Sequence, residues 1–293
     1  MLTALVVRGL ATGPFAVALR PLTALGPGDG TPWALALLRR AALTRPGRPV
    51  PLPGRTGHGR ARAAEVLDGL AVDIELEHAH GRSRTRLRAD GPDATEVRVV
   101  PGSDAPPAAL AERGWSFVRV ADGRIGTSAA PDERTKTCAQ VLADHERAPV
   151  RPVLRFPPPR DDRPGRLRAQ AELWAGYVAR PDPGRQPALP GMPAAPPPAA
   201  RFRGPGLNRR VLLPASLDRG FRQALPVTVA GLLVAPGGLL VVGPDADGSA
   251  GPEGPAALRL GAFLARVGAA RVQVVLATAE PHLVAGLRIP PPR

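Results

Sequence analysis

The sequence predicts an α/β protein with a mixed sheet flanked by helices, an antiparallel β subdomain and a proline-rich connector. Residues 217–289 read as helix, apolar strand, amphipathic helix and apolar strand, which is typical of a sheet buried on both faces. Residues 70–120 instead alternate apolar and polar side chains, as strands with one solvated face do. Residues 149–206 contain 15 prolines in 58 positions, which disfavours regular helices and central strands there. We therefore divide the chain into an N-terminal lobe (1–148), this connector and a C-terminal lobe (207–293).

The N-terminal lobe begins with two apolar runs and a glycine-rich turn. The first run spans residues 2–10 and the second spans residues 15–25, where Pro21 interrupts it. The apolar residues of the following segment, TPWALALLRRAAL, recur at helical spacing. We expect strand, strand, turn and helix, in this order, within residues 1–45.

The remaining elements are predicted from the spacing of apolar residues. Antiparallel strands are expected at AVDIELEHAH, RTRLRAD, EVRVVPG and WSFVRVADGRI, the last with an Asp-Gly turn. Helices are expected at TKTCAQVLADHE, at LRAQAELWAGYVA within the connector, and at GFRQALPVTVAGLLVA, where Pro226 either kinks the helix or marks its start. GGLLVVG and RVQVVLATA read as buried strands on either side of the helix GPAALRLGAFLARVGAA, a βαβ unit of right-handed crossover.

Composition leaves two interpretations of the charge. The chain has 293 residues, 44% of them hydrophobic but only 3% aromatic, so its core must consist of Leu, Val and Ala. The formal net charge is +14, and Lys136 is the only lysine among 39 basic residues. Arginine pairs bidentately with phosphate, which favours a nucleic-acid partner. The arginines are scattered along the chain, however, and this favours the codon bias of a GC-rich genome instead.

The single cysteine and the lack of long apolar runs predict a cytoplasmic protein without membrane association. Cys138 alone cannot form an internal disulfide and excludes most cysteine-based metal sites. The short apolar run at the N-terminus has neither a basic region before it nor a clear cleavage site after it. No uninterrupted apolar stretch approaches the roughly 20 residues that a membrane helix needs.

The turn after the second apolar run has the layout of a phosphate-binding loop, although by itself it also fits a plain turn. A working loop needs glycines that expose backbone N–H groups, a lysine for the β- and γ-phosphates, and a hydroxyl for Mg²⁺. The first two glycines keep the turn, but Thr31 replaces the last glycine, Pro32 the lysine and Trp33 the hydroxyl. The predicted loop positions are Gly26, Gly28, Asp29, Gly30, Thr31, Pro32 and Trp33.

Both ends of the chain together resemble AAA-family ATPases of the RecF/SMC-like, ABC-type group, which includes the OLD-like ATPases. MLTALVVRGL and FAVALRPLTALGPGDGTPWALALL resemble the opening strands and phosphate loop of that group. Residues 225–289 resemble its second lobe, with a Walker B strand, a helix and a later strand. The middle of the chain does not match. The resemblance implies a P-loop NTPase-like fold of ABC type, whose heads pair face to face with nucleotide between them.

The resemblance also implies where the second half of a nucleotide site would lie. After the strand LLVV, Gly243 stands in place of the acidic residue that polarises water. Asp245 and Asp247 lie downstream, where they either reach a metal or form turns. In the signature motif Gln223 is kept, but Arg222 replaces the serine that touches the γ-phosphate across the dimer.

The last motif of the group is partly present at the end of the chain. Thr278 and His282 match it, whereas Ala277 and Ala279 replace the acidic residue and the switch histidine. His282 is also readily explained as a surface histidine. Across all motifs the phosphate-contacting positions have changed while the surrounding hydrophobic periodicity survives.

Two other groupings carry weaker signals. Glu77, His78 and His80 place two histidines on one strand as a metal pair, but no third ligand is evident nearby. Cys138 and His145 lie two helical turns apart, and this spacing does not orient a base toward a nucleophile. We therefore predict no metal site and no catalytic residues.

These observations favour a catalytically inactive ATPase-like protein that acts as a binding or regulatory subunit. Its expected partner is an active homologous ATPase or a second copy of the chain, and no cofactor is expected unless the degenerate site still binds ATP and Mg²⁺. The first alternative is a nucleic-acid-associated protein of the same group. The second is a working ATPase that uses unorthodox residues such as Asp245 and arginines in place of lysine.

The resemblance gives two expectations about packing. Residues 1–45 and 217–289 should share one mixed sheet, with LTAL and GGLLVV as buried neighbours. Trp33 should either be exposed beside the emptied loop, where it would form a partner surface with Arg219, Phe221 and Arg222, or be buried in the vacated phosphate cavity.

Overall fold

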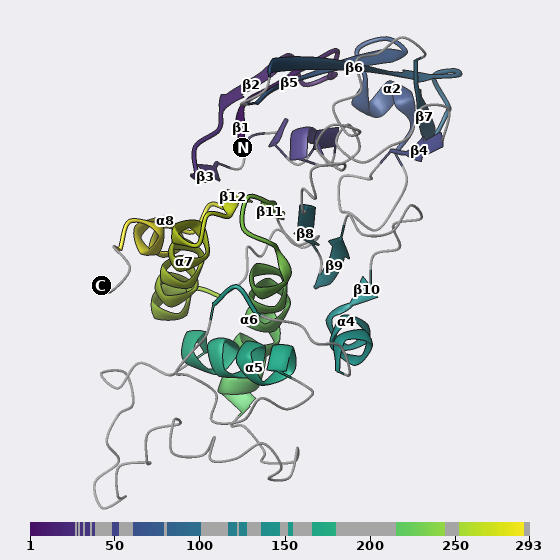
Figure 1. The fold of residues 1–293 in the computed structure, drawn as a ribbon. Coiled ribbons are helices and arrows are strands. Elements are labelled where there is room, and N and C mark those ends of the chain that lie inside the picture. The colour runs from purple at the N-terminus through teal and green to yellow at the C-terminus, as the bar shows by residue number, and fades with distance from the viewer. Residues whose placement is uncertain are drawn as a thin grey trace, which may run out of the picture.

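The computed structural model describes residues 1–26, 28, 30–31, 33–35, 37–38, 49–52, 61–78, 81–100, 117–121, 123–127, 136–146, 152–154, 166–179, 215–243 and 252–289. In these segments the strands form two six-stranded sheets, and a group of helices covers the side of the second sheet that faces away from the first (Figure 1).

The first sheet, named the antiparallel sheet, has the strand order β2-β1-β5-β6-β7-β4 and is antiparallel throughout. Its strands are β1 (Leu2–Arg8), β2 (Phe15–Ala18), β4 (Pro49–Pro51), β5 (Ala71–His78), β6 (Gly81–Ala89) and β7 (Glu96–Val99). Along β6, Ser83, Thr85, Leu87 and Ala89 are buried while the residues between them are exposed. The antiparallel strands with one solvated face predicted for this region are confirmed.

The second sheet, named the mixed sheet, has the order β10-β9-β8-β11-β12-β3. Its strands are β3 (Leu22–Leu25), β8 (Phe117–Ala121), β9 (Arg124–Thr127), β10 (Lys136–Thr137), β11 (Leu239–Val242) and β12 (Gln273–Ala277). The pairs from β8 through β11 and β12 to β3 are parallel, and the pairs β8–β9 and β9–β10 are antiparallel. The predicted mixed sheet containing both ends of the chain is confirmed for β3, β11 and β12.

The predicted neighbours within that sheet were wrong. LTAL occurs in β1 and again as β3, and neither copy pairs with β11. β3 pairs with β12, and β1 belongs to the antiparallel sheet. The reason is that the unit β11, α7 (Gly254–Ala269), β12 places its two strands side by side, while β8 occupies the other edge of β11.

The hairpin β8–β9 is also placed differently from the prediction. It turns at Gly123, whose φ of 64° lies in the left-handed region that glycine adopts without strain. The two strands are antiparallel as expected, but β8 pairs with β11 and so joins the mixed sheet. Alternation of apolar residues reports that one face is buried and does not report which sheet a strand joins.

The described helices other than the one after β3 are α2 (Ala63–Val66), α4 (Cys138–His145), α5 (Arg166–Val178), α6 (Ala215–Leu233), α7 and α8 (Pro281–Leu287). The predicted helix at α4 is confirmed, and a capping box starts it: Thr137 Oγ1 accepts from Gln140 N at 3.3 Å while the Gln140 side chain accepts from Thr137 N at 2.9 Å. α6 begins eleven residues before Pro226, so the reading of Pro226 as the helix start was wrong.

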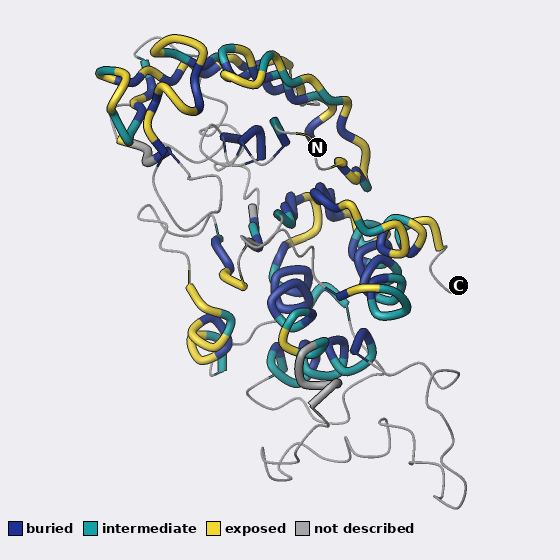
Figure 2. Tube along the Cα trace, turned by 180° about the vertical axis from the view of Figure 1, so that it is seen from behind, coloured by how far each residue is buried: buried dark blue, intermediate teal, exposed yellow. Residues whose placement is uncertain are grey.

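Two cores lie on opposite faces of the mixed sheet (Figure 2). The first core lies between the two sheets and surrounds helical residues 31, 33–35, 37 and 38, which we name the inner helix. The second core joins the other face to α5, α6 and α7, with Trp174 of α5 almost fully buried. Residues 166–178 are therefore packed against the body of the protein, although they lie within the predicted connector; the rest of 155–206 lies outside the described residues apart from Ala179.

The chain crosses between the sheets at Pro21, where one apolar run becomes two strands. Leu19 N donates to Thr3 O in the antiparallel sheet, and Val274 N donates to Pro21 O in the mixed sheet. The buried side chain of Gln273 joins the same two sheets, because Leu2 N donates to its Oε1 at 2.9 Å and its Nε2 donates to Leu2 O at 2.7 Å. The junction is thus fixed by hydrogen bonds as well as by apolar packing.

Candidate functional site

The parallel strands of the mixed sheet end at one edge, where ligands bind in open α/β sheets. Leu25 lies opposite Ala277, and Val242 lies opposite Leu276. Gly26, Gly243 and Thr278 follow these strands and are therefore neighbours, as the resemblance implied. Thr278 N donates to Leu25 O at 2.9 Å, and Gly243 N donates to Val120 O at 2.8 Å.

The loop after β3 is closed by its own hydrogen bonds. Gly28 N donates to Gly26 O at 2.9 Å, and Thr31 N donates to Gly28 O at 3.0 Å. The Thr31 hydroxyl also donates to Gly26 O, at 3.0 Å. A phosphate cradle requires backbone N–H groups that converge on the anion, and these two N–H groups point at carbonyls of the loop instead. Asp29 and Pro32 lie outside the described residues.

The N-terminal β1–β2 connection and the first core cover the loop and its helix. A Cβ on Gly30 would lie 3.4 Å from Thr12 Oγ1 and 3.5 Å from Phe15 Cδ2, so these side chains already contact the loop. Trp33 is only 6% exposed and packs in the first core. The expectation of an exposed Trp33 at a partner surface was therefore wrong, because the large apolar area of the indole is buried between the two sheets.

Arg222 and Gln223, which were predicted as signature remnants, lie inside a helix and not at its start. α6 begins at Ala215, so Arg222 and Gln223 lie after nearly two turns, where backbone N–H groups bond within the helix. They offer a ligand their side chains only. Arg222 is exposed and Gln223 is half-buried.

Thr278 and His282, which were predicted as remnants of the last motif, lie at the start of α8. Thr278 is buried, and its Oγ1 accepts from Glu280 N at 3.0 Å. The Glu280 carboxylate caps the helix by accepting from His282 N at 3.2 Å, and it lies 2.7 Å from His282 Nδ1. His282 is exposed and paired with its own helix cap. This arrangement explains Thr278 and His282 as a helix start without reference to nucleotide.

A cavity of about 340 Å³ brings four of the predicted site residues together, namely Arg222, Gln223, Gly243 and Thr278. Its remaining walls come from β8, the β8–β9 turn, β11, β12, α6, α7 and α8: Val120, Gly123, Pro226, Val227, Val242, Leu260, Leu264, Leu276, Ala277 and Leu283. Most of these side chains belong to the second core. The cavity therefore lies on the helix-covered face of the mixed sheet, away from the inner helix.

Neither of the weaker groupings forms a reactive centre in the described part of the chain. No group of three His, Cys, Asp or Glu residues there is placed to hold a metal, and His80 and the side chain of His78 lie outside it. Burial raises the pKa of the Cys138 thiol to about 11, although Arg168 opposes the shift. A thiol with this pKa is protonated at neutral pH and is a poor nucleophile.

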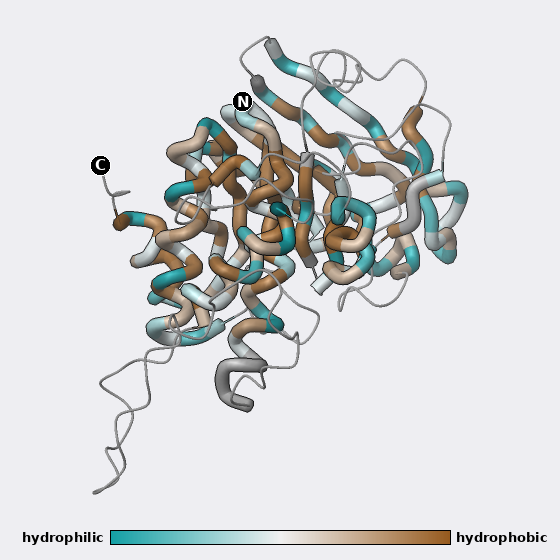
Figure 3. Tube along the Cα trace, turned by 60° about the horizontal axis from the view of Figure 1, so that its bottom comes forward, coloured by the Kyte–Doolittle hydropathy of each residue, from teal (hydrophilic) through white to brown (hydrophobic). Residues whose placement is uncertain are grey.

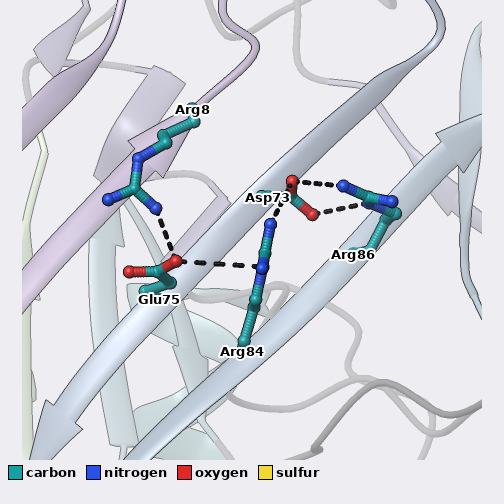
Figure 4. Close-up of polar contacts among 5 residues, drawn as sticks. All are labelled: Arg8, Asp73, Glu75, Arg84 and Arg86. Carbon is teal, nitrogen blue, oxygen red and sulfur yellow. Dashed lines mark hydrogen bonds and ion pairs between the residues drawn. The ribbon is translucent and has the colours of Figure 1, made fainter.

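The sequence reasoning did not single out the outer face of the antiparallel sheet, where ion pairs join three strands (Figure 4). Asp73 accepts from Arg86 Nε at 2.7 Å and from Arg84 Nη2 at 2.9 Å, and Arg8 pairs with Glu75. The hydrogen bonds from Arg86 lower the pKa of the Asp73 carboxyl against the effect of desolvation, and Arg84 adds to the lowering. The sequence did contain a signal for this face. Arginine occupies every second position of GRSRTRLRA, and VDIELE carries acidic residues at the same spacing.

No helix in the described segments is long and apolar enough to span a bilayer. No protein-family model matches the sequence, and neither does any curated protein. Among solved structures the chain is similar to an SMC head domain bound to the C-winged helix domain of ScpA, with 10% identity over 97% of this chain and 91% of that chain, at a TM-score of 0.50. It is also similar to the SMC head domain from Thermotoga maritima, with 11% identity over the same shares and a TM-score of 0.44. The chain thus has the mixed α/β, P-loop NTPase-like fold of SMC heads.

Proposed function

We propose that this chain is a degenerate ATPase head that acts as a binding or regulatory subunit and does not hydrolyse ATP. The loop after β3 carries the proposal, because the N–H groups of Gly28 and Thr31 bond to carbonyls of the loop itself. A phosphate bound there would have to break both bonds. At the strand ends Gly243, Ala277 and Ala279 stand at the positions where such sites place an acid. Asp245 and Asp247, further along the chain, lie outside the described residues.

Calorimetric titration with MgATP tests this proposal. We expect no saturable binding up to about 1 mM ligand, because lost charged contacts to phosphate each weaken binding by roughly ten-fold or more. Pro32→Lys alone should not restore binding, since the Thr31 side chain still fills the loop. A micromolar dissociation constant for the unmodified chain would overturn the proposal.

The binding role requires a protein partner, which we propose to be an active homologous ATPase or a second copy of this chain. The similar SMC head bound to a domain of ScpA supports the use of this fold for binding another protein. Light scattering of the purified chain, alone and mixed with an active ATPase of the same group, measures either assembly. A monomer in both samples would contradict this part of the proposal.

Nucleic-acid association is a second candidate, and the outer face of the antiparallel sheet favours it. That face carries the exposed arginines Arg8, Arg82, Arg84, Arg86, Arg88 and Arg98. Four carboxylates share the face, namely Asp73, Glu75, Glu77 and Glu96. Asp73 and Glu75 form the ion pairs of Figure 4, and Glu77 pairs with Arg82. Asp90, directly after β6, also pairs with Arg98. The six arginines therefore exceed the five carboxylates by one, so a polyanion would be attracted only weakly.

Fluorescence anisotropy with a DNA duplex at increasing salt tests the second candidate. If this face binds DNA, affinity falls with salt, and Arg88→Glu weakens binding because it reverses one charge on the face. Arg20→Glu is the matched control, since Arg20 is exposed but precedes β3 in the other sheet. Equal losses from both variants would show that net charge and not this face governs binding.

A further inference from the structure

The cavity at the strand ends has the size and lining of a small-molecule site. Its volume of about 340 Å³ lies at the lower end of the range of roughly 300–1,000 Å³ that is usual for ligand pockets. Val227, Val242 and Ala277 form an apolar wall that keeps some accessible surface, whereas Leu260, Leu264 and Leu276 are nearly fully buried. Such a wall excludes water from an aliphatic or aromatic group and favours its burial.

Each polar side chain of the cavity can donate a hydrogen bond. Arg222 contributes a guanidinium, and Gln223 contributes an amide. The Thr278 hydroxyl accepts from Glu280 N, which leaves its own hydrogen for a further acceptor. None of the described lining residues is acidic. A ligand with an anionic acceptor therefore fits this set better than a cation or a neutral donor.

One side of the cavity is held rigidly by two glycines where α7 meets α8. A Cβ on Gly261 would lie 2.2 Å from Leu283 O, and one on Gly286 would lie 2.2 Å from Leu258 O. The two helix backbones are thus in direct contact, and this contact holds Leu283 at the cavity. Preformed walls reduce the ordering entropy that a ligand must overcome on binding.

We propose that this cavity binds a small apolar monocarboxylate, with its hydrocarbon group against the wall of Val227, Val242 and Ala277 and its carboxylate near Arg222, Gln223 and Thr278. The site lies on the face of the mixed sheet opposite the inner helix, so the proposal goes beyond the loss of ATP binding and does not depend on it. A ligand here contacts α6, α7 and α8 together and would stabilise their packing.

Calorimetric titration with hexanoate and with hexan-1-ol, in the absence of nucleotide, tests the site. Hexanoate should bind saturably and at least about ten-fold more tightly than hexan-1-ol, which lacks the charged acceptor. Arg222→Gln should weaken hexanoate binding by about ten-fold and leave hexan-1-ol within about two-fold. Gln223→Glu should abolish hexanoate binding, because it places a carboxylate at the mouth of the cavity. Arg20→Gln is the matched control at the opposite edge of the sheet and should change neither ligand.

The proposal is overturned if hexanoate shows no saturation at concentrations on the order of 10 mM. It is also overturned if hexanoate and hexan-1-ol bind equally, or if Arg222→Gln and Gln223→Glu leave the hexanoate affinity unchanged. Circular dichroism and thermal melting of each variant show that it is folded. Both substituted side chains lie at the exposed or half-buried rim, where we expect folding to be unaffected.

Discussion

In the antiparallel sheet one face packs on the first core and the other carries charged side chains, whereas β11 and β12 of the mixed sheet are buried on both faces. Figure 3 shows the contrast as alternating hydropathy in the outer strands and continuous hydrophobic colour in the central ones. An exposed face tolerates substitution because water replaces lost contacts. A strand or helix inside the second core has no such replacement, so the two regions should respond to mutation on different scales.

The largest expected effect is at the contact of α7 and α8. Gly261→Ala places a methyl group 2.2 Å from Leu283 O, which the two backbones can accommodate only by separating. Overpacking of this kind costs about 3 kcal/mol or more when backbone must move. Urea denaturation followed by circular dichroism measures the loss. Gly91→Ala is the control, since its Cβ would meet nothing within 4 Å, and an equal loss there would remove the explanation.

The next effect is at the junction of the two sheets. Gln273→Leu leaves Leu2 N, Leu2 O and Arg20 O without the partner that the amide provides, which should cost about 2 kcal/mol. Gln273→Glu keeps the acceptor for Leu2 N but loses the donor at neutral pH. The loss of stability in Gln273→Glu should be smaller in acid, because the protonated carboxyl can again donate a hydrogen bond. A deficit of Gln273→Glu that grows as pH falls would contradict this account.

A smaller effect is expected on the outer face of the antiparallel sheet. Asp73→Asn removes the charged partner of Arg84 and Arg86 and should cost about 1 kcal/mol or less at pH 7. Because the folded state lowers the pKa of Asp73, its contribution is present above the unfolded value near 3.9 and is lost as pH falls through the folded value. The two proteins should therefore converge in stability as the pH falls from neutral through the folded pKa of Asp73. Thermal melts across this range measure the convergence, and a constant difference would refute it.

The smallest expected effect is a gain in folding stability. Arg88 lies directly opposite Arg98 on the outer face, and like charges at this position destabilise a sheet. Arg88→Glu should therefore stabilise the protein by about 0.5 kcal/mol. A loss of DNA binding in this same variant, together with the gain, would assign the loss to charge and not to misfolding. A destabilised variant would break that assignment.

Sequence reasoning located most strands because each has its own local signal. The alternation in β5 and β6 and the unbroken apolar run of β12 reflect the burial of one or both faces. Pairing partners carry no such signal. The segment LTAL occurs in both β1 and β3, yet the two copies lie in different sheets. The chain crosses between the sheets at Pro21, and the hydrogen bonds of Gln273 to Leu2 fix this junction.

The position of the candidate site could be predicted from the sequence, but the conformation of its loop and the burial of its side chains could not. The glycine turn after β3 and the ends of β11 and β12 follow from the strand pattern, and they meet at one edge as expected. The burial of Trp33 depends on the antiparallel sheet, which packs on the first core. The closure of the loop depends on hydrogen bonds of Gly28 and Thr31 within the loop, which the glycine pattern does not specify. The cavity beside Arg222 depends on how α6, α7 and α8 meet, which the spacing of apolar residues does not specify.

The bonds between Leu2 and Gln273 join positions 271 residues apart, and β3 has β12 as its neighbour in the sheet. During synthesis from the N-terminus, β3 and the inner-helix segment therefore emerge long before the strand that completes their sheet exists. Until β12 leaves the ribosome, an apolar edge of four residues has nothing of its own chain to pair with. Contacts of such long range slow folding and prolong the exposure of aggregation-prone edges. The nascent chain should accordingly depend on chaperones for most of its synthesis, and removal of residues 273–289 should leave the N-terminal lobe unable to complete its fold.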